Sequence, residues 1–316
     1  MLFGLCAGSF NPEKDIPSLE GKVVLVTGGN IGLGQQAVLE FARHNPRQIW
    51  LGARNLVKAR AAVDEIQKQV HDAPIKILHM DLSSFESVKK AAKRFSAESD
   101  RLDILMLNAG VMATAPGELT MEGYEMQFGT NHMGHALFTK LLLPVLDKTA
   151  KSGPATDVRI VSLSSALHKS GPKQGIVFES LKTTDTGLSP VALYCQSKLA
   201  NFLFARHLAK LYPQFTIAAV HPGVVRTNLV SGASGMPAPV RMIGPVVSYF
   251  LSSVDQGVRN QLWASVSKDV VSGEYYEPVG VGGKCRPLGK DDGLAKRLWD
   301  WTERELAEHG ATNDEE

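Results

Sequence analysis

The chain has 316 residues, of which 44% are hydrophobic and 21% are charged, as in an ordinary globular protein. Its net charge of +2 is too small to indicate a nucleic-acid partner, and its three cysteines have neither metal-ligand nor disulfide spacing. No apolar run reaches the roughly 20 residues that span a bilayer, and the N-terminus lacks the basic start of a signal peptide. We therefore expect one cytoplasmic domain over residues 1–316, without a metal, a nucleic-acid partner or an integral membrane segment.

Short runs rich in β-branched residues alternate with longer helical patterns along the chain. Strands are expected at 22–26, 47–53, 75–80, 102–108, 158–164 and 215–220. Helices are expected at 33–44, 56–70, 84–97, 125–146, 192–212 and 294–309. Largely apolar strands separated by helices predict a single doubly wound α/β domain of the Rossmann type, with about seven parallel strands and helices on both faces. Residues 1–20 are expected to form an N-terminal extension, and residues 310–316 a frayed acidic tail.

A glycine-rich stretch, TGGNIGLG at 27–34, joins the first expected strand to the first expected helix. Its pattern is T-G-x-x-x-G-x-G, which differs from the common dinucleotide fingerprint G-x-G-x-x-G. In an open α/β sheet, glycines at this turn let backbone amides approach a pyrophosphate, and the next helix offers its N-terminus to the phosphates. The alternative interpretation is a tight turn that binds no ligand.

Two further motifs follow the glycine turn in order. Asn108-Ala109-Gly110 comes after the fourth expected strand, and Tyr194 lies four residues before Lys198 in a helical segment. Each motif is weak alone, but the ordered set resembles the short-chain dehydrogenase/reductase family from about residue 21 to residue 278. The runs NHMGHALFTKLLLPVL and YCQSKLANFLFARHLA are most similar to the retinol dehydrogenase and WW-domain oxidoreductase branch.

The resemblance implies a nicotinamide cofactor at the carboxyl ends of the strands. Asp81 would bind the adenine amino group and Asn108 the adenine ribose, while Pro222 and Gly223 would flank the nicotinamide. From the residues alone, Asp81 is alternatively a helix cap and Asn108 a turn residue. The full set of implied cofactor contacts is Gly28, Asn30, Ile31, Gly32, Gly34, Arg54, Asp81, Leu82, Asn108, Ala109, Gly110, Tyr194, Lys198, Pro222, Gly223, Val225 and Thr227.

The end of the second expected strand indicates which nicotinamide cofactor is used. NAD enzymes usually place an acid there to bind the ribose 2′-hydroxyl, whereas an arginine accommodates the 2′-phosphate of NADP. Here Ala53 stands at the expected acid position and Arg54 follows it. A guanidinium binds a phosphate through charge-assisted hydrogen bonds, so we predict NADP(H). The alternative is a surface arginine that begins the next helix.

Tyr194 and Lys198 are spaced to share one face of a helix. An unperturbed tyrosine has a pKa of about 10, and a neighbouring ammonium favours the phenolate and lowers that pKa. The resemblance implies that Tyr194 is the general acid/base, and that Lys198 tunes it and holds the nicotinamide ribose. No metal site is expected, because His132 and His135 lack a third ligand and are interpreted as packing residues or as residues that make incidental polar contacts.

The resemblance implies two more catalytic residues. A serine at the end of the fifth strand would hold the substrate oxygen, and we choose Ser165 over Ser164, although the long stretch before Tyr194 leaves that choice open. Asn131 in FGTNHMGH would kink its helix and hold a water that relays protons to Lys198.

The predicted function is an NADP-dependent oxidoreductase that transfers a hydride between the nicotinamide and a lipophilic carbonyl or alcohol. Residues 229–251 are implied to form the substrate lid, and their run IGPVVSYFL favours a lipophilic small molecule. A homodimer through the helices that hold Asn131 and Tyr194 is one assembly that the resemblance implies. Two alternatives stay open: a non-catalytic NADP-binding sensor or scaffold, and a reductase of an activated C=C bond.

Overall fold

The structure is a computed structural model that describes residues 10–153, 156–225, 235 and 252–310. Its centre is a parallel sheet of seven strands in the order β3-β2-β1-β4-β5-β6-β7. The strands are β1 (Val23–Thr27), β2 (Gln48–Ala53), β3 (Ile75–His79), β4 (Ile104–Leu107), β5 (Val158–Leu163), β6 (Phe215–Val220) and β7 (Tyr275–Tyr276). The strand order reverses direction at β1, so the carboxyl ends of β1 and β4 form the crevice in which such sheets bind ligands.

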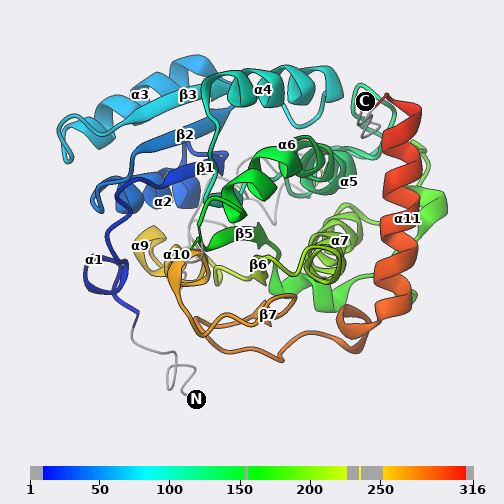
Figure 1. The fold of residues 1–316 in the computed structure, drawn as a ribbon. Coiled ribbons are helices and arrows are strands. Elements are labelled where there is room, and N and C mark those ends of the chain that lie inside the picture. The colour runs from blue at the N-terminus through cyan, green and yellow to red at the C-terminus, as the bar shows by residue number, and fades with distance from the viewer. Residues whose placement is uncertain (1–9, 154–155, 226–234, 236–251, 311–316) are drawn as a thin grey trace.

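Helices cover both faces of the sheet, as the doubly wound fold requires (Figure 1). Successive strand residues alternate between the two layers. Val24 and Val26 pack in the core beneath the helices at 32–42, 56–67 and 259–266, whereas Val23 and Leu25 pack in the core beneath the helices at 85–98, 134–150, 190–211 and 292–308. The helical elements are α1 (Pro12–Asp15), α2 (Gly32–Ala42), α3 (Leu56–Gln67), α4 (Phe85–Glu98), α5 (Met126–Phe128), η1 (Gly129–Met133), α6 (Gly134–Ala150), η2 (Ala166–Ser170), η3 (Phe178–Ser180), α7 (Pro190–Leu211), α9 (Val254–Gly257), α10 (Arg259–Val266), η5 (Pro287–Lys290) and α11 (Asp292–Glu308). The predicted Rossmann-type fold is confirmed.

The elements differ from the sequence pattern in four places. The helix expected at 125–146 is interrupted by η1, a π-helical turn between α5 and α6. β7 has two residues, too few to show any periodicity, and α10 buries the amides Asn260 and Gln261, which breaks its apolar pattern. Part of the expected N-terminal extension packs on the domain, because Phe10, Ile16 and Leu19 are buried against the layer that holds α2 and α10.

The last helix, α11, docks against α7, and its two half-buried tryptophans contact aromatic rings of the domain. Trp299 stacks on Phe204 with ring centres 5.3 Å apart, and Trp301 meets Phe128 edge-on at 5.8 Å. Figure 1 shows α11 running along the outer side of α7 at the right of the molecule. Of the predicted lid and tail, the structure describes only Gly235 and Gly310.

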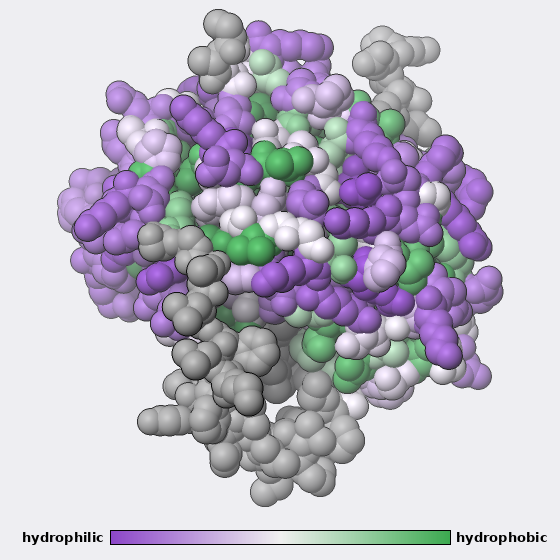
Figure 2. All heavy atoms as spheres, turned by 90° about the horizontal axis from the view of Figure 1, so that it is seen from below, coloured by the Kyte–Doolittle hydropathy of each residue, from purple (hydrophilic) through white to green (hydrophobic). Residues whose placement is uncertain are grey.

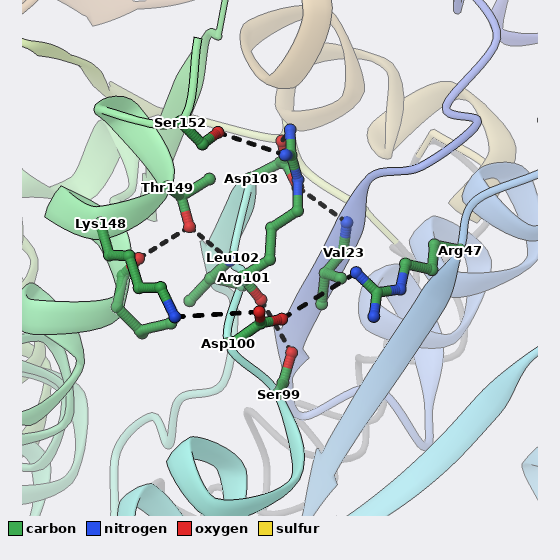
Figure 3. Close-up of polar contacts among 11 residues, drawn as sticks. Val23, Arg47, Ser99, Asp100, Arg101, Leu102, Asp103, Lys148, Thr149 and Ser152 are labelled. Carbon is green, nitrogen blue, oxygen red and sulfur yellow. Dashed lines mark hydrogen bonds and ion pairs between the residues drawn. The ribbon is translucent and has the colours of Figure 1, made fainter.

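The amino ends of β1 and β4 are joined by one buried carboxylate (Figure 3). Asp103 precedes β4 and is fully buried, and its Oδ2 accepts hydrogen bonds from the amide of Val23 at 2.9 Å and from Nε of Arg101 at 2.8 Å. Nearby Asp100 makes exposed ion pairs with Arg47 at 4.0 Å and with Lys148 at 3.8 Å. Asp103 therefore holds the sheet together at the edge opposite the ligand crevice.

The surface seen in Figure 2 is mostly hydrophilic, and hydrophobic side chains of the described residues are scattered between polar ones. Single hydrophobic residues on a surface are ordinary and need no binding partner to explain them. Among the described residues, no helix has both the length and the apolar character that crossing a bilayer requires.

Candidate active site

The glycine turn forms a backbone cradle between β1 and α2. Gly28 and Gly32 have φ angles of +65° and +56°, in the left-handed region that favours glycine. A Cβ on Gly34 would lie 2.2 Å from the carbonyl oxygen of Gly28 and 2.5 Å from Nδ2 of Asn108, so no side chain fits there. The cradle is therefore lined by main-chain atoms, as a pyrophosphate site requires.

The helix that follows this turn starts with open amides. No side chain caps the N-terminus of α2, where Ile31 is the cap residue, and the first turn holds no acid. Ile31 is 41% exposed, and Asn30 beside it is half-buried. An uncapped N-terminus with its positive dipole end favours an anion. The residues present at this turn thus fit the phosphates of a dinucleotide.

The Asn108-Ala109-Gly110 motif ties the end of β4 to the end of β1. The amides of Asn108 and Ala109 both donate to Oγ1 of Thr27 at 2.9 Å, and Nδ2 of Asn108 donates to the Thr27 carbonyl at 2.8 Å. The backbone and side chain of Asn108 thus bind main-chain and side-chain atoms of Thr27, as expected for the alternative interpretation of Asn108 as a turn residue. A Cβ on Gly110 would lie 3.1 Å from Oδ1 of Asn131 and 3.3 Å from Nζ of Lys198, which brings this turn against two predicted catalytic residues.

Asp81 lies at the carboxyl end of β3 and does not cap the following helix. Its Oδ1 accepts from the amide of Ser83 at 2.9 Å and from the Ser83 hydroxyl at 2.7 Å, while Ser84 is the residue that caps α4. The alternative interpretation of Asp81 as a helix cap is therefore wrong. Leu82 is buried, and its carbonyl oxygen would lie 2.3 Å from a Cβ on Gly134, which places α6 directly against this loop.

Arg54 follows β2 with its side chain exposed and makes no ion pair with any of the described residues. Asn55, the next residue, caps α3 by accepting a hydrogen bond from the amide of Lys58 at 2.9 Å. Asn55, and not Arg54, is therefore the residue that caps the N-terminus of α3. The guanidinium of Arg54 is left available at the strand end.

Tyr194 and Lys198 lie on one face of α7, which Ser189 caps, and both side chains are 4% exposed. Nζ of Lys198 lies 5.7 Å from the centre of the Tyr194 ring and donates to the carbonyl of Leu163, at the end of β5, at 3.0 Å. Among the described residues, Lys198 pairs with no carboxylate.

The two candidate serines at the end of β5 have different surroundings. Ser164 donates its hydroxyl to the carbonyl of Lys198 at 2.7 Å and so fastens β5 to α7. Ser165 caps η2, where its Oγ accepts a hydrogen bond from the amide of Leu167 at 3.2 Å. A side-chain hydrogen bond between Ser165 and Tyr194 lowers the tyrosine pKa. Ser165 is therefore the serine whose hydroxyl is associated with Tyr194.

Burial dominates the ionisation of the Tyr194–Lys198 pair. It raises the pKa of Tyr194 to about 12, against the lowering effect of Ser165, and it lowers the pKa of Lys198 to about 8. The sequence argument predicted the opposite direction for the tyrosine. In the protein alone, the loss of solvent raises the tyrosine pKa by more than the hydrogen bond with Ser165 lowers it. The phenol is thus held in its neutral, proton-donating form.

Asn131 lies in the π-helical turn η1 and is fully buried. Its amide clamps the loop after β4: Oδ1 accepts from the amide of Val111 at 2.8 Å and Nδ2 donates to the Val111 carbonyl at 2.9 Å. Nδ2 also donates to Oγ of Ser197 at 2.9 Å, which reaches α7. The expected irregularity of this helix is present as the π turn, and the amide joins the turn after β4 to the tyrosine helix.

The loop after β6 provides the remaining predicted contacts. Gly223 has a φ angle of +88°, and Pro222 beside it is half-buried. Val225 pairs with Ser252 in an isolated parallel bridge and packs on α9, where a Cβ on Gly257 would lie 2.3 Å from the Val225 side chain. Thr227, the last residue predicted here, lies outside the described residues.

Two buried histidines have specific partners that the sequence did not reveal. Nε2 of His132 lies 2.9 Å from Oγ1 of Thr302 on α11, and the ring of His135 bridges Asn131 and Thr27. The described residues contain no cluster of three or more metal-ligating side chains, and both histidines make hydrogen bonds. The spacing of four residues between Asn131 and His135 could have indicated their contact from the sequence, since it places both residues on one face of a helix.

Comparisons with known proteins show to which family the chain belongs. The family model for short chain dehydrogenase matches residues 22–236. A short-chain dehydrogenase/reductase of Aspergillus calidoustus is 39% identical over 305 residues, covering 92% of this chain and 95% of that protein. Retinol dehydrogenase 13 of Homo sapiens is 37% identical over 299 residues, covering 92% of this chain and 86% of that protein.

A solved structure of an uncharacterized protein from Mycobacterium paratuberculosis superimposes with a TM-score of 0.70 and 29% identity, covering 93% of this chain and 96% of that one. The region matched by the family model, residues 22–236, includes the glycine turn, the Asn108 motif and the Tyr194–Lys198 pair. The chain belongs to the short-chain dehydrogenase/reductase family, whose members are oxidoreductases that bind a nicotinamide cofactor.

Proposed function

We infer that the protein transfers a hydride between NADP(H) and a lipophilic carbonyl or alcohol, with Tyr194 as the general acid/base. The observation that carries this proposal is the convergence of Tyr194, Lys198, Ser165 and Asn131 at the carboxyl ends of β4 and β5, beside a glycine cradle built for phosphates. Retinol dehydrogenase 13, which is named for a lipophilic alcohol, supports the substrate class.

Arg54 supports the choice of NADP(H), because its free guanidinium stands at the strand end where a 2′-phosphate would lie and no acid precedes it. The open amides of α2 would hold the pyrophosphate, and Asp81 has one carboxylate oxygen that accepts no hydrogen bond from the described residues. That oxygen suits an adenine amino group. When bound, the nicotinamide supplies or accepts the hydride.

The residues of this chain provide the proton chemistry. Ser165 would hold the substrate oxygen by a hydrogen bond and stabilise the negative charge that develops on it. Tyr194, kept protonated by burial, would donate its phenolic proton to that oxygen as the carbonyl carbon is reduced. Lys198 and Asn131 would resupply the proton, and alcohol oxidation would run the same transfers in reverse.

The test is NADPH consumption over a panel of lipophilic aldehydes, ketones and quinones, with NADH in parallel. We expect turnover with NADPH, and a loss of at least about 100-fold in Tyr194→Phe with the NADPH dissociation constant unchanged. Tight NADPH binding without turnover on any member would favour the sensor or scaffold alternative. Reduction of a C=C bond, identified by product analysis, would replace carbonyl reduction as the reaction.

A further inference from the structure

His135 occupies the space between the cofactor turn and the catalytic helix, although neither hydride nor proton transfer uses it. The side chain is 3% exposed and projects from the first turn of α6. Its Nδ1 lies 2.9 Å from the main-chain carbonyl of Asn131, and its Nε2 lies 2.9 Å from Oγ1 of Thr27. Both ring nitrogens are therefore occupied by residues that belong to the site.

The chemistry of the partners determines which ring nitrogen carries the proton. A carbonyl oxygen can only accept, so Nδ1 of His135 carries the hydrogen and donates it to Asn131. Burial, together with the charge of Lys198, lowers the pKa of His135 to about 4, so the ring is neutral and Nε2 is an acceptor. The Thr27 hydroxyl consequently donates to Nε2 while it accepts from the amides of Asn108 and Ala109.

These contacts are part of one continuous buried path. Thr27 ends β1 and begins the glycine turn, and His135 connects it to Asn131. The Asn131 amide continues to Oγ of Ser197, which donates to the carbonyl of Tyr194 at 2.8 Å. The path runs from the residue that begins the phosphate cradle to the residue that moves the proton.

We propose that His135 is a positioning residue that fixes the cofactor turn and the catalytic helix relative to each other, through one hydrogen bond to Thr27 and another to the Asn131 carbonyl. This inference rests on the proposed function. Each link has its own consequence. The link to Thr27 orders the turn that holds the cofactor, and the link to Asn131 sets the π turn from which the Asn131 amide reaches α7.

The two links can be separated by substitution. In His135→Asn, the short amide reaches the Nδ1 position and keeps a donor for the Asn131 carbonyl. In His135→Gln, the longer amide reaches the Nε2 position and keeps an acceptor for Thr27. His135→Leu keeps neither. His132→Leu is the matched control, because it removes a buried histidine hydrogen bond three residues away that leads only to Thr302.

We expect His135→Leu to lower kcat about tenfold and to raise the NADPH dissociation constant about tenfold, each from the loss of one buried hydrogen bond. His135→Asn should recover most of kcat but not the affinity, and His135→Gln should recover most of the affinity but not kcat. His132→Leu should lower the Tm and leave both constants within about twofold. A His135→Leu enzyme that loses only Tm would overturn the proposal, and so would two amide variants that behave alike.

A readout without turnover separates this inference from the proposed function. The nitrogen-15 NMR signals of the His135 ring, assigned by their loss in His135→Asn, should show the Nδ1–H tautomer with no titration between pH 5.5 and 8. An Nε2–H tautomer would overturn the inference even if the enzyme is active. A wild-type protein that binds NADPH but reduces nothing would refute the proposed function, while the affinities of the variants would still decide the Thr27 link.

Discussion

The ammonium of Lys198 lies 5.7 Å from the centre of the Tyr194 ring, and both side chains are almost completely buried. No carboxylate of the described residues balances this cation, whose nearest polar partner is the carbonyl of Leu163 at 3.0 Å. That carbonyl also accepts from Nδ2 of Asn201 at 3.0 Å, so it keeps a partner if the lysine is removed. The buried ammonium of Lys198 therefore destabilises the folded protein, and it lies beside Tyr194, the proposed general acid/base.

Lys198→Met should stabilise the protein at neutral pH and abolish turnover. The folded-state pKa of Lys198 is about 8, below its ordinary value of 10.5, so the unfolded chain binds more protons between these values and wild-type stability rises with pH there. Below pH 8 the wild type carries the full cost of burying the ammonium. We expect the variant to gain about 1–3 kcal/mol at pH 7 and to lose that advantage progressively as the pH rises from 8 towards 10.5.

Urea unfolding of both proteins at several pH values between 6 and 9.5 measures this difference. The prediction is wrong if the wild type is the more stable protein at pH 7, or if the advantage of the variant does not change with pH.

Arg54→Glu should weaken NADPH binding about 10- to 100-fold and change NADH binding less than about threefold. The substitution replaces a charge-assisted donor with an acid that repels a 2′-phosphate, and NADH has no phosphate there. Arg60→Glu on α3 is the matched control, since it makes the same change of charge at another exposed arginine. Titration calorimetry with both cofactors is the measurement. Equal weakening of NADPH and NADH in Arg54→Glu would contradict the assignment.

Ser165→Ala should mainly lower kcat, whereas Ser164→Ala should mainly lower stability. Removing the Ser165 hydroxyl should lower kcat about 100-fold with a small effect on stability, because a donor to the developing oxyanion is lost. Removing the Ser164 hydroxyl should cost about 1 kcal/mol of stability, because it breaks the bond to the Lys198 carbonyl that fastens β5 to α7. Steady-state kinetics and thermal unfolding of both variants test the pair. The reverse pattern would make Ser164 the catalytic serine.

Asp103→Ala should destabilise the protein by about 2–4 kcal/mol and leave the NADPH dissociation constant unchanged. The buried carboxylate holds Val23 and Arg101 at the amino edge of the sheet, away from the cofactor turn. Asp100→Ala, at an acid whose side chain is 67% exposed, should cost at most about 0.5 kcal/mol. Chemical denaturation gives both values. Similar losses in the two variants would show that Asp103 contributes no more than a surface pair.

The alternation of apolar strands and helices was enough to predict the sheet, because it depends only on which residues are buried. Features that depend on side-chain partners were not predictable in the same way. The sequence could not show that burial raises the pKa of Tyr194, nor that the hydroxyl of Ser164 is already committed to α7, since both depend on three-dimensional contacts. The sequence could not show the hydrogen bond of His135 to Thr27 either, because the two residues are 108 positions apart in the chain.

The π turn at Gly129–Met133 has a further consequence for how this chain tolerates changes in length. Such a turn closes its hydrogen bonds five residues apart, one more than an α-helix, so it holds one surplus residue. Deleting a single residue there would let α5 and α6 join into a regular helix, with little damage to the fold itself. If the deleted residue lies between Asn131 and His135, the deletion would rotate these two residues relative to each other by about 100°, one helical step, and separate the two halves of the site. This short segment therefore sets the relative orientation of the site residues on the two sides of the turn. A variant with one continuous regular helix would fold well but would lack a correctly arranged site.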